Sequence, residues 1–232
     1  MEQLRNPLPT LTRKELNIGY AYLVFQFLFL PVLLQLLGNL FFFTINETLI
    51  NFTYFSVNFL GVSAIFSKFL KKSLLRSFRF PRQVLLSAAL GFLAYWLCST
   101  LVGIVTQTLF PEFVNLNDSQ IVSILGDYPV LMFLGTVIFV PVAEEVLHRG
   151  LVFGSLFQKN IPLAFCASAV LFAMIHVVQY IGLYSPGYLL LALVQYLPAG
   201  FTFAWAYRRS GSIFAPILIH ALNNAIAISL TR

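Results

Sequence analysis

The chain has 232 residues, of which 59% are hydrophobic and only 9% charged, and its mean hydropathy is +0.86. A soluble domain would carry roughly 25% charged residues, so the composition excludes an ordinary soluble enzyme or binding domain. The formal net charge is +6, but the basic residues lie in short segments between apolar runs, which favours membrane orientation over nucleic-acid binding. We therefore expect one integral membrane domain over residues 1–232.

The expected fold is an all-α, polytopic transmembrane helical bundle of about seven to eight spans. A membrane-crossing helix needs about 20 mostly apolar residues, and helices are required because no alternating barrel pattern is present. The fourth candidate segment is too long to cross perpendicular to the bilayer, so it must tilt, bend at Pro141 or project from the membrane. The candidate spans are 18–43, 48–67, 84–109, 128–157, 162–181, 187–207 and 213–230.

The charges between these spans predict their orientation, because Lys and Arg concentrate in cytoplasmic loops. The basic loop residues are Arg5, Arg13, Lys14, Lys68, Lys71, Lys72, Arg76, Arg79, Arg82, Lys159, Arg208 and Arg209. The alternate loops contain no Lys or Arg, and their acidic residues are Glu47, Glu112, Asp118 and Asp127. Seven spans would place the N-terminus in the cytoplasm and the C-terminus outside, in the plasma membrane of a prokaryote.

Segment 67–82, SKFLKKSLLRSFRFPR, is basic and amphipathic. Leu70, Leu74 and Phe78 recur at helical spacing opposite the basic residues. Two interpretations are open: a helix on the cytoplasmic surface that contacts anionic lipid, or a charged loop that only sets the membrane orientation.

The fourth span contains a polar cluster, Glu144, Glu145, His148 and Arg149. Charge in hydrocarbon costs several kcal/mol, so such groups rarely lie there without a partner. Residues four apart share a helix face, which pairs Glu145 with Arg149 and places His148 on the face of Glu144. Glu144 therefore needs a partner on another helix or a water molecule. It is either part of a salt-bridge network that fixes packing or a buried general base.

Two later spans also carry polar side chains at helical spacing. Phe172 and His176 lie four residues apart in the fifth span, and His220 and Asn224 lie four apart in the seventh. A single intramembrane His or Asn often only links helices. Polar groups in three spans together predict one shared cavity suited to hydrolysis, in which a carboxylate activates water and side-chain donors stabilise the oxyanion.

Several other hydrolytic designs are absent from the sequence. It contains no His-Glu-x-x-His zinc motif and no Gly-x-Ser-x-Gly elbow, and both aspartates, Asp118 and Asp127, fall in or beside one loop. Zinc held by Glu144, His176 and His220 is chemically feasible, although nothing in their spacing requires it.

Three motifs resemble those of the type II CAAX prenyl endopeptidase family, also called the CPBP or Abi family of intramembrane proteases. The stretch GSIFAPILIHALNN is especially similar. The resemblance covers residues 125–230, the expected catalytic core, whereas the N-terminal spans in 1–110 carry no recognised motif. The motifs are Glu144-Glu145-x-x-x-Arg149, Phe172-x-x-x-His176 and His220-x-x-x-Asn224.

The resemblance implies a helical membrane fold whose cavity opens to the cytoplasm or laterally to lipid. It also implies a glutamate-based peptide hydrolysis that uses no metal or other cofactor. Glu144 and His176 would activate the water, and His220 and Asn224 would form the oxyanion site.

Four further residues would have secondary roles in this scheme. Glu145 and Arg149 would support the site, and Phe172 would wall the cavity beside His176. His148 stands where family members often have Phe, and its imidazole could alter the acidity of Glu144 or offer a metal ligand.

The expected function is an intramembrane endopeptidase acting on CAAX-type prenylated or other membrane-associated polypeptides. Its partners would be a peptide or protein substrate and the lipid bilayer, with anionic lipid at 67–82, and not nucleic acid. The alternatives are a non-proteolytic membrane scaffold or bacteriocin-immunity-type protein, a zinc-dependent membrane protease, and a small transporter with a protonatable glutamate. The last would be indicated by inverted repeats, which we do not find.

Overall fold

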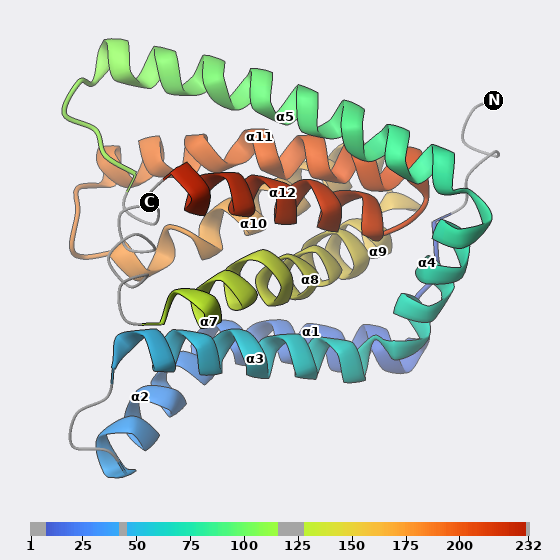
Figure 1. The fold of residues 1–232 in the computed structure, drawn as a ribbon, viewed down its shortest axis with the longest axis horizontal. Coiled ribbons are helices and arrows are strands. Elements are labelled where there is room, and N and C mark those ends of the chain that lie inside the picture. The colour runs from blue at the N-terminus through green and yellow to red at the C-terminus, as the bar shows by residue number, and fades with distance from the viewer. Residues whose placement is uncertain (1–7, 42–45, 116–127, 231–232) are drawn as a thin grey trace.

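The structure is a computed structural model, and it describes residues 8–41, 46–115 and 128–230. Every named element in these ranges is a helix (Figure 1). The longer helices are α1 Arg13–Leu28, α2 Leu30–Phe41, α3 Glu47–Ile65, α4 Ser67–Arg79, α5 Pro81–Leu109, α10 Ile161–Ile175, α11 Pro186–Ser210 and α12 Phe214–Leu230. The short helices α7 Pro129–Leu134, α8 Val140–Glu145 and α9 Gly154–Phe157 belong to one continuous run.

Length and hydropathy identify four candidate membrane spans among the described residues: α3, α5, the run α7–α9 and α11. Helices α1 and α2 make a fifth if they are counted as one span bent by 50°. Helices α10 and α12 are apolar but have only 15 and 17 residues. The all-α membrane fold is thus confirmed with four to five candidate spans, and the count of seven stays a prediction.

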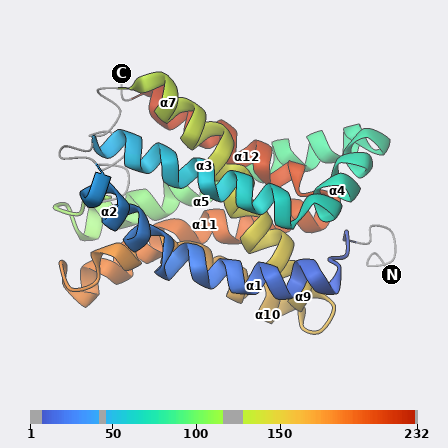
Figure 2. The ribbon, with the colours of Figure 1, turned by 90° about the horizontal axis from the view of Figure 1, so that it is seen from below.

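The helices are arranged around the inclined run α7–α9. Helices α5, α11 and α12 lie on one side of this run and α1 and α3 on the other, while α2 turns away from the bundle (Figure 1). Figure 2 looks onto the layer that α1 and α3 form. Helix α11 packs against both α5 and α10, and α12 packs against α5, α8 and α11. The three spans with polar motifs are therefore neighbours.

The run α7–α9 contains two π-helical stretches, Gly135–Phe139 and Val146–Phe153. Such wide turns are rare and often occur at functional sites. Pro141 lies between them in α8, and its missing N–H removes one helical hydrogen bond. Figure 1 shows the run crossing at an incline without a sharp break. The run is thus inclined within the bundle and is not sharply bent at Pro141, while its tilt or projection relative to a bilayer stays a prediction.

Helix α10 ends earlier than the helix expected over 162–181, and His176 is its C-cap. The backbone N–H of His176 bonds only three residues back. Its ring Nδ1 lies 2.9 Å from the carbonyl oxygen of Phe172, the acceptor that the backbone of a continuing α-helix would use. The chain then turns through Gly182 at φ 87°, a conformation that favours glycine. The expectation that His176 lies well inside a helical span is therefore wrong.

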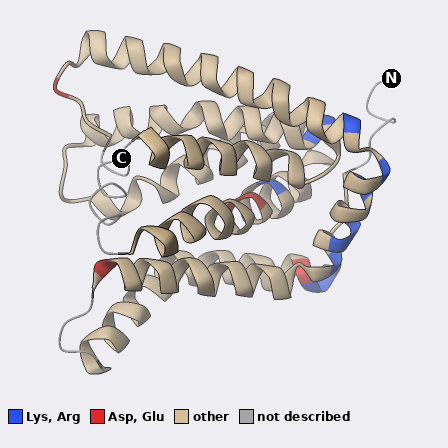
Figure 3. Cartoon of the chain, in the orientation of Figure 1, with Lys and Arg blue, Asp and Glu red and all other residues tan. Residues whose placement is uncertain are grey.

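The two ends of the bundle carry opposite charges. Figure 3 shows Lys and Arg gathered at the end where α4 lies. These basic residues are Arg13, Lys14, Lys68, Lys71, Lys72, Arg76, Arg79, Arg82, Lys159, Arg208 and Arg209. At the other end, the described residues include the acidic Glu47 and Glu112 and no Lys or Arg. Asp118 and Asp127, expected on that side, lie outside the described residues.

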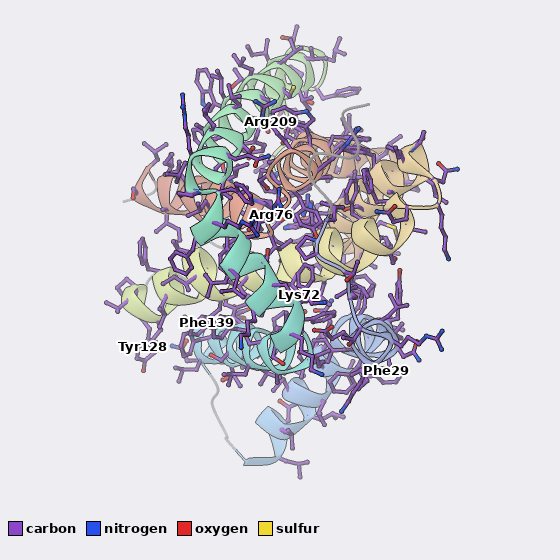
Figure 4. The ribbon with its side chains drawn as sticks, turned by 90° about the vertical axis from the view of Figure 1, so that its right-hand side faces the viewer. Phe29, Lys72, Arg76, Tyr128, Phe139 and Arg209 are labelled. Atoms are coloured by element: carbon purple, nitrogen blue, oxygen red, sulfur yellow. The ribbon has the colours of Figure 1, made fainter. Side chains whose placement is uncertain are left out.

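Segment 67–82 forms helix α4 and the start of α5. Helix α4 crosses the basic end from α3 to α5, with Lys72 and Arg76 on it (Figure 4). Its inner face buries Phe69 and Ser73, whereas Phe78 is 74% exposed. The amphipathic helix is thus present, and its contact with anionic lipid stays a prediction.

Helices α10 and α11 pack closely at Gly200. A Cβ atom on Gly200 would lie 2.6 Å from the Cβ atom of Ala169 and 2.7 Å from its Cα atom. Because real Cβ contacts are longer, any side chain at this position must push the two helices apart.

We expect Gly200→Val to lower the free energy of unfolding by about 1–3 kcal/mol, because overpacking separates α10 from α11. Thermal unfolding in detergent measures the change. Gly103→Ala is the matched control, because no atom lies within 4 Å of a Cβ there. Equal stability of Gly200→Val and the native chain would show that the contact is not tight.

Candidate active site

A cavity of about 830 Å³ lies between the motif helices and the layer of α1 and α3. This volume is within the range of ligand-binding pockets. The motif residues along its wall are Glu144, His148, Phe172, His176, His220 and Asn224. Glu145 and Arg149 do not line it and are fully buried behind it.

Glu144 and His176 face each other across a short gap. Oε2 of Glu144 lies 3.9 Å from Nε2 of His176, which is too long for a direct hydrogen bond but suits a bridging water. His176 Nδ1 must donate to the carbonyl of Phe172, so Nε2 of the neutral ring is an acceptor. Oε2 of Glu144 is buried and has no hydrogen-bond partner among the described residues. A water at this position could donate to both groups.

Glu145 joins two basic side chains through one oxygen atom. Its Oε1 accepts a hydrogen bond from Nη1 of Arg149 at 3.0 Å and lies 2.9 Å from Nδ1 of His220. The first contact is the i,i+4 pair that the sequence indicates. The second connects α8 to α12 across 75 residues. Because a carboxylate only accepts, Nδ1 of His220 donates to it.

Arg149 completes this network with contacts to α10 and α11. Its Nη2 donates to the carbonyl oxygens of Ala199 at 3.0 Å and Gly200 at 3.3 Å. The guanidinium carbon lies 4.3 Å from the ring centre of Phe172 and 5.2 Å from that of Phe203, within cation–π range. Arg149 therefore connects the run α7–α9 to helices α10 and α11.

Asn224 enters the cavity with its amide orientation defined by a hydrogen bond. Its Nδ2 donates to the carbonyl oxygen of Thr136 at 2.8 Å. An amide nitrogen carries two hydrogens, so this contact leaves one of them unused. Asn224 is thus placed as a directed neutral donor, one helical turn from His220.

His148 lies on the cavity wall but does not bond the Glu144 carboxylate. Its Nδ1 lies 2.8 Å from the backbone carbonyl oxygen of Glu144, while its Nε2 is buried without a hydrogen-bond partner among the described residues. Its influence on Glu144 stays a prediction.

Aromatic rings fix the orientation of the imidazoles. Phe172 contacts the rings of His148, His176 and His220, with centroid distances of 5.5, 4.9 and 5.9 Å. Tyr196 stacks on His176 at 4.2 Å with an interplanar angle of 20°. Phe172 thus lies where a wall residue is expected, whereas the sequence analysis did not identify Tyr196.

The polar face of α3 was not predicted from the sequence. Glu47, Asn51, Tyr54 and Asn58 all line the cavity, and the Tyr54 hydroxyl donates to Oε1 of Gln26 at 3.0 Å. Their spacing of four, three and four residues places them on one helix face. Polar residues at this spacing in an apolar segment are the sequence pattern that could have indicated this face.

Across residues 8–41, 46–115 and 128–230, no group of three or more His, Cys, Asp or Glu side chains is arranged to hold a metal ion. The zinc ligands considered above were Glu144, His176 and His220. In this structure these three side chains are not arranged as a metal-binding group.

The fold and the cavity define a helical membrane protein with a buried carboxylate, imidazole and carboxamide site. Residues 126–226 match the model of the Rce1-like family, described as type II CAAX prenyl endopeptidase Rce1-like. This segment is thus similar to the Rce1-like membrane peptidase family, which confirms the resemblance seen in the three motifs.

Two curated bacterial proteins are similar to about half of the chain. The "Putative membrane peptidase YdiL" of Bacillus subtilis is 28% identical over 113 residues, covering 48% of this chain and 41% of the relative. The "UPF0177 protein YxdF" of Lactococcus lactis is 32% identical over 111 residues, covering 47% and 55%. The matches thus span about half the length of these relatives. No solved structure matches the chain significantly.

We expect Arg149→Gln to lower the free energy of unfolding by about 3–5 kcal/mol, because it leaves the buried Glu145 carboxylate without its main countercharge. The double variant Glu145→Gln/Arg149→Gln should lose less than the sum of the single changes. Chemical unfolding in detergent measures this cycle, with the exposed Arg79→Gln as control. Strictly additive losses would show that the two side chains are not coupled.

Proposed function

We propose that this chain is an intramembrane endopeptidase that hydrolyses peptide bonds with a water activated by Glu144. The observation that carries the proposal is the 3.9 Å gap between Glu144 Oε2 and His176 Nε2 in the wall of a cavity. The match of residues 126–226 to a peptidase family supports it. The mechanism and the substrate are parts of this proposal.

The proposed reaction begins with a water between the two side chains. Glu144 takes a proton from the water while His176 Nε2 accepts its second hydrogen, which orients the oxygen lone pair toward the scissile carbonyl carbon. Hydroxide attack forms the tetrahedral oxyanion. Glu144 then returns its proton to the leaving nitrogen as the carbon–nitrogen bond breaks, so the carboxylate is regenerated.

His220 and Asn224 are the proposed oxyanion donors. Asn224 offers its second Nδ2 hydrogen, as described above. Since His220 Nδ1 donates to Glu145, the Nε2 atom carries a hydrogen only in the protonated ring. Glu145 supplies the countercharge for that ring. Its proposed role is therefore to position and balance His220 in addition to pairing with Arg149.

The proposed location is the plasma membrane of a prokaryote, with the basic end of the bundle in the cytoplasm. This orientation follows the positive-inside rule and gives a cytoplasmic N-terminus and an external C-terminus for seven spans. Helix α4 would then lie at the cytoplasmic surface, where Lys71 and Lys72 can contact anionic headgroups. The substrate would be a membrane-associated polypeptide.

We expect Glu144→Gln to reduce cleavage by about 10²–10⁴-fold, because the amide cannot take the proton from water. The measurement is a quantitative comparison of peptides in membranes that contain either the wild-type chain or the variant. A peptide produced only by the wild-type chain would also identify the substrate. Glu112→Gln, an exposed residue outside the cavity, is the matched charge control.

Unchanged peptide patterns with Glu144→Gln, together with an intact thermal unfolding transition, would contradict hydrolysis by this site. A biological activity that persists in Glu144→Gln/His176→Ala would instead support the scaffold or immunity function. Both outcomes depend on comparing equal amounts of folded protein.

We expect Asn224→Ala to reduce kcat by about 10²–10³-fold with little change in KM, because an oxyanion donor acts mainly in the transition state. Cleavage of the substrate peptide identified above gives both constants. The control Asn17→Ala, at an exposed position of α1 outside the cavity, should lose much less. A loss confined to KM would show that Asn224 binds substrate without stabilising the oxyanion.

A further inference from the structure

The cavity occupies only one half of the bundle. On α3 its lining residues run from Glu47 to Asn58 and stop there, although the helix continues to Ile65. On α12 they run from His220 toward the C-terminus, and the preceding turns do not contribute. In both helices the lining half is the one toward the acidic end of the bundle (Figures 1 and 3).

The run α7–α9 and helix α11 show the same pattern. On the run α7–α9, the lining residues end at His148, and on α11 they end at Phe203. The remaining turns of both helices, toward the basic end, do not line the cavity. The motif residues therefore form the floor of a cavity that extends about 16 Å along α3, from Asn58 to Glu47.

The rim of this cavity is polar and exposed. Gln35, Glu47 and Gln179 line it and are exposed to solvent, whereas His148, Phe172 and Phe203 on the floor are at most 3% exposed. All three rim residues belong to the acidic end. The exposed polar residues of the lining thus lie at the acidic end, and the buried floor lies toward the basic end.

Beyond the floor, a packed apolar cluster fills the basic half. Phe66, Phe69, Leu151, Tyr207 and Ile213 belong to it, and each is fully buried. A Cβ atom on Gly150 would lie 3.0 Å from the ring of Phe69, so this ring from α4 is tight against the backbone that follows Arg149. Such packing leaves little space for water.

Helix α4 is fastened across this end by polar contacts. Ser73 Oγ accepts a hydrogen bond from the backbone N–H of Ile213 at 2.7 Å, and Arg76 Nε donates to the carbonyl oxygen of Ser210 at 3.0 Å. The backbone N–H of Phe69 donates to Oε1 of Glu15 at 2.8 Å. Figure 4 looks onto this closed face.

The charge asymmetry gives these two ends a direction in the membrane. The end closed by α4 carries eleven Lys and Arg residues among those described, and the open end carries none. Since Lys and Arg mark the cytoplasmic side, we infer that the cavity is entered from the extracytoplasmic side and that its substrate is an exported or membrane-anchored polypeptide cleaved on that side. The assignment of a substrate to this cavity rests on the proposed function, whereas the direction of opening does not.

This direction differs from the opening that the family resemblance implies, which is to the cytoplasm or laterally to lipid. A prenylated C-terminus in the cytoplasm would meet the basic face and helix α4, not the polar rim. The substrate class is therefore set by the side of the membrane on which a polypeptide is presented.

The direction of opening is tested by thiol accessibility in intact cells. Cys98 and Cys166 are free and exposed, so both are first replaced by Ala. Single cysteines are then introduced as Ala227→Cys in the cavity wall, Ile226→Cys beside it outside the cavity, and Lys71→Cys at the basic end. The probe is a charged, membrane-impermeant methanethiosulfonate.

We expect the Ala227→Cys variant to react in intact cells at least about tenfold faster than Ile226→Cys, because a thiol in lipid forms little of the reactive thiolate. The Lys71→Cys variant should react only after permeabilisation. Reaction of Ala227→Cys only after permeabilisation, or no reaction under either condition, would overturn the inference.

A second measurement separates this inference from the proposed function. The labelling is repeated with the Glu144→Gln variant, because labelling does not require catalysis. In parallel, peptides released into the medium are compared with those retained in the cytoplasm. External labelling without any peptide that depends on Glu144 would reject the hydrolase but leave the opening in place. Peptides that depend on Glu144 and arise only in the cytoplasm would reject the extracytoplasmic substrate but leave the hydrolase in place.

Discussion

The structure depends on a buried ionic network centred on Glu145. One oxygen of this carboxylate binds the guanidinium of Arg149 and the imidazole of His220, so a single acceptor joins two of the three motif helices. In a low-dielectric interior such contacts are strong only while every partner stays in place. The network therefore constrains the distance between α8 and α12, and with it the position of Asn224 one turn beyond His220. Glu144, outside the network, is left facing the cavity.

The same network reaches α11 through a residue that also controls helix packing. The carbonyl oxygen of Gly200 accepts from Arg149, and the absence of a side chain on Gly200 lets α10 approach to contact distance at Ala169. Helix α10 can then place His176, at its C-terminal end, 3.9 Å from Glu144. Small-residue contacts of this kind are typical of membrane helices, where close packing replaces the hydrophobic effect. The ionic network and the close helix contact thus support the same alignment.

The sequence predicts the local part of this arrangement well and the long-range part poorly. Helical spacing alone indicates the Glu145–Arg149 pair, because both residues lie on one helix. It could not indicate that His220 shares the same oxygen, since 75 residues separate them and only tertiary packing brings them together. The early end of α10 was also missed, because a side-chain hydrogen bond from His176 to the helix competes with continued backbone bonding. The polar face of α3 was detectable by its spacing, but no family motif drew attention to it.

A cavity that reaches the middle of a membrane protein from one side requires a complete barrier on the other. Here the barrier begins where the ionic network ends. Arg149 lies buried behind the cavity wall. The next residue, Gly150, packs so closely that a Cβ atom on it would lie 3.0 Å from the ring of Phe69 in helix α4. Any displacement of α4 would remove that ring from the backbone beside Arg149 and expose its buried charges to water, which would weaken their attraction by raising the local dielectric constant. Helix α4 therefore helps to keep the charges of the site buried, even though none of its residues lines the cavity.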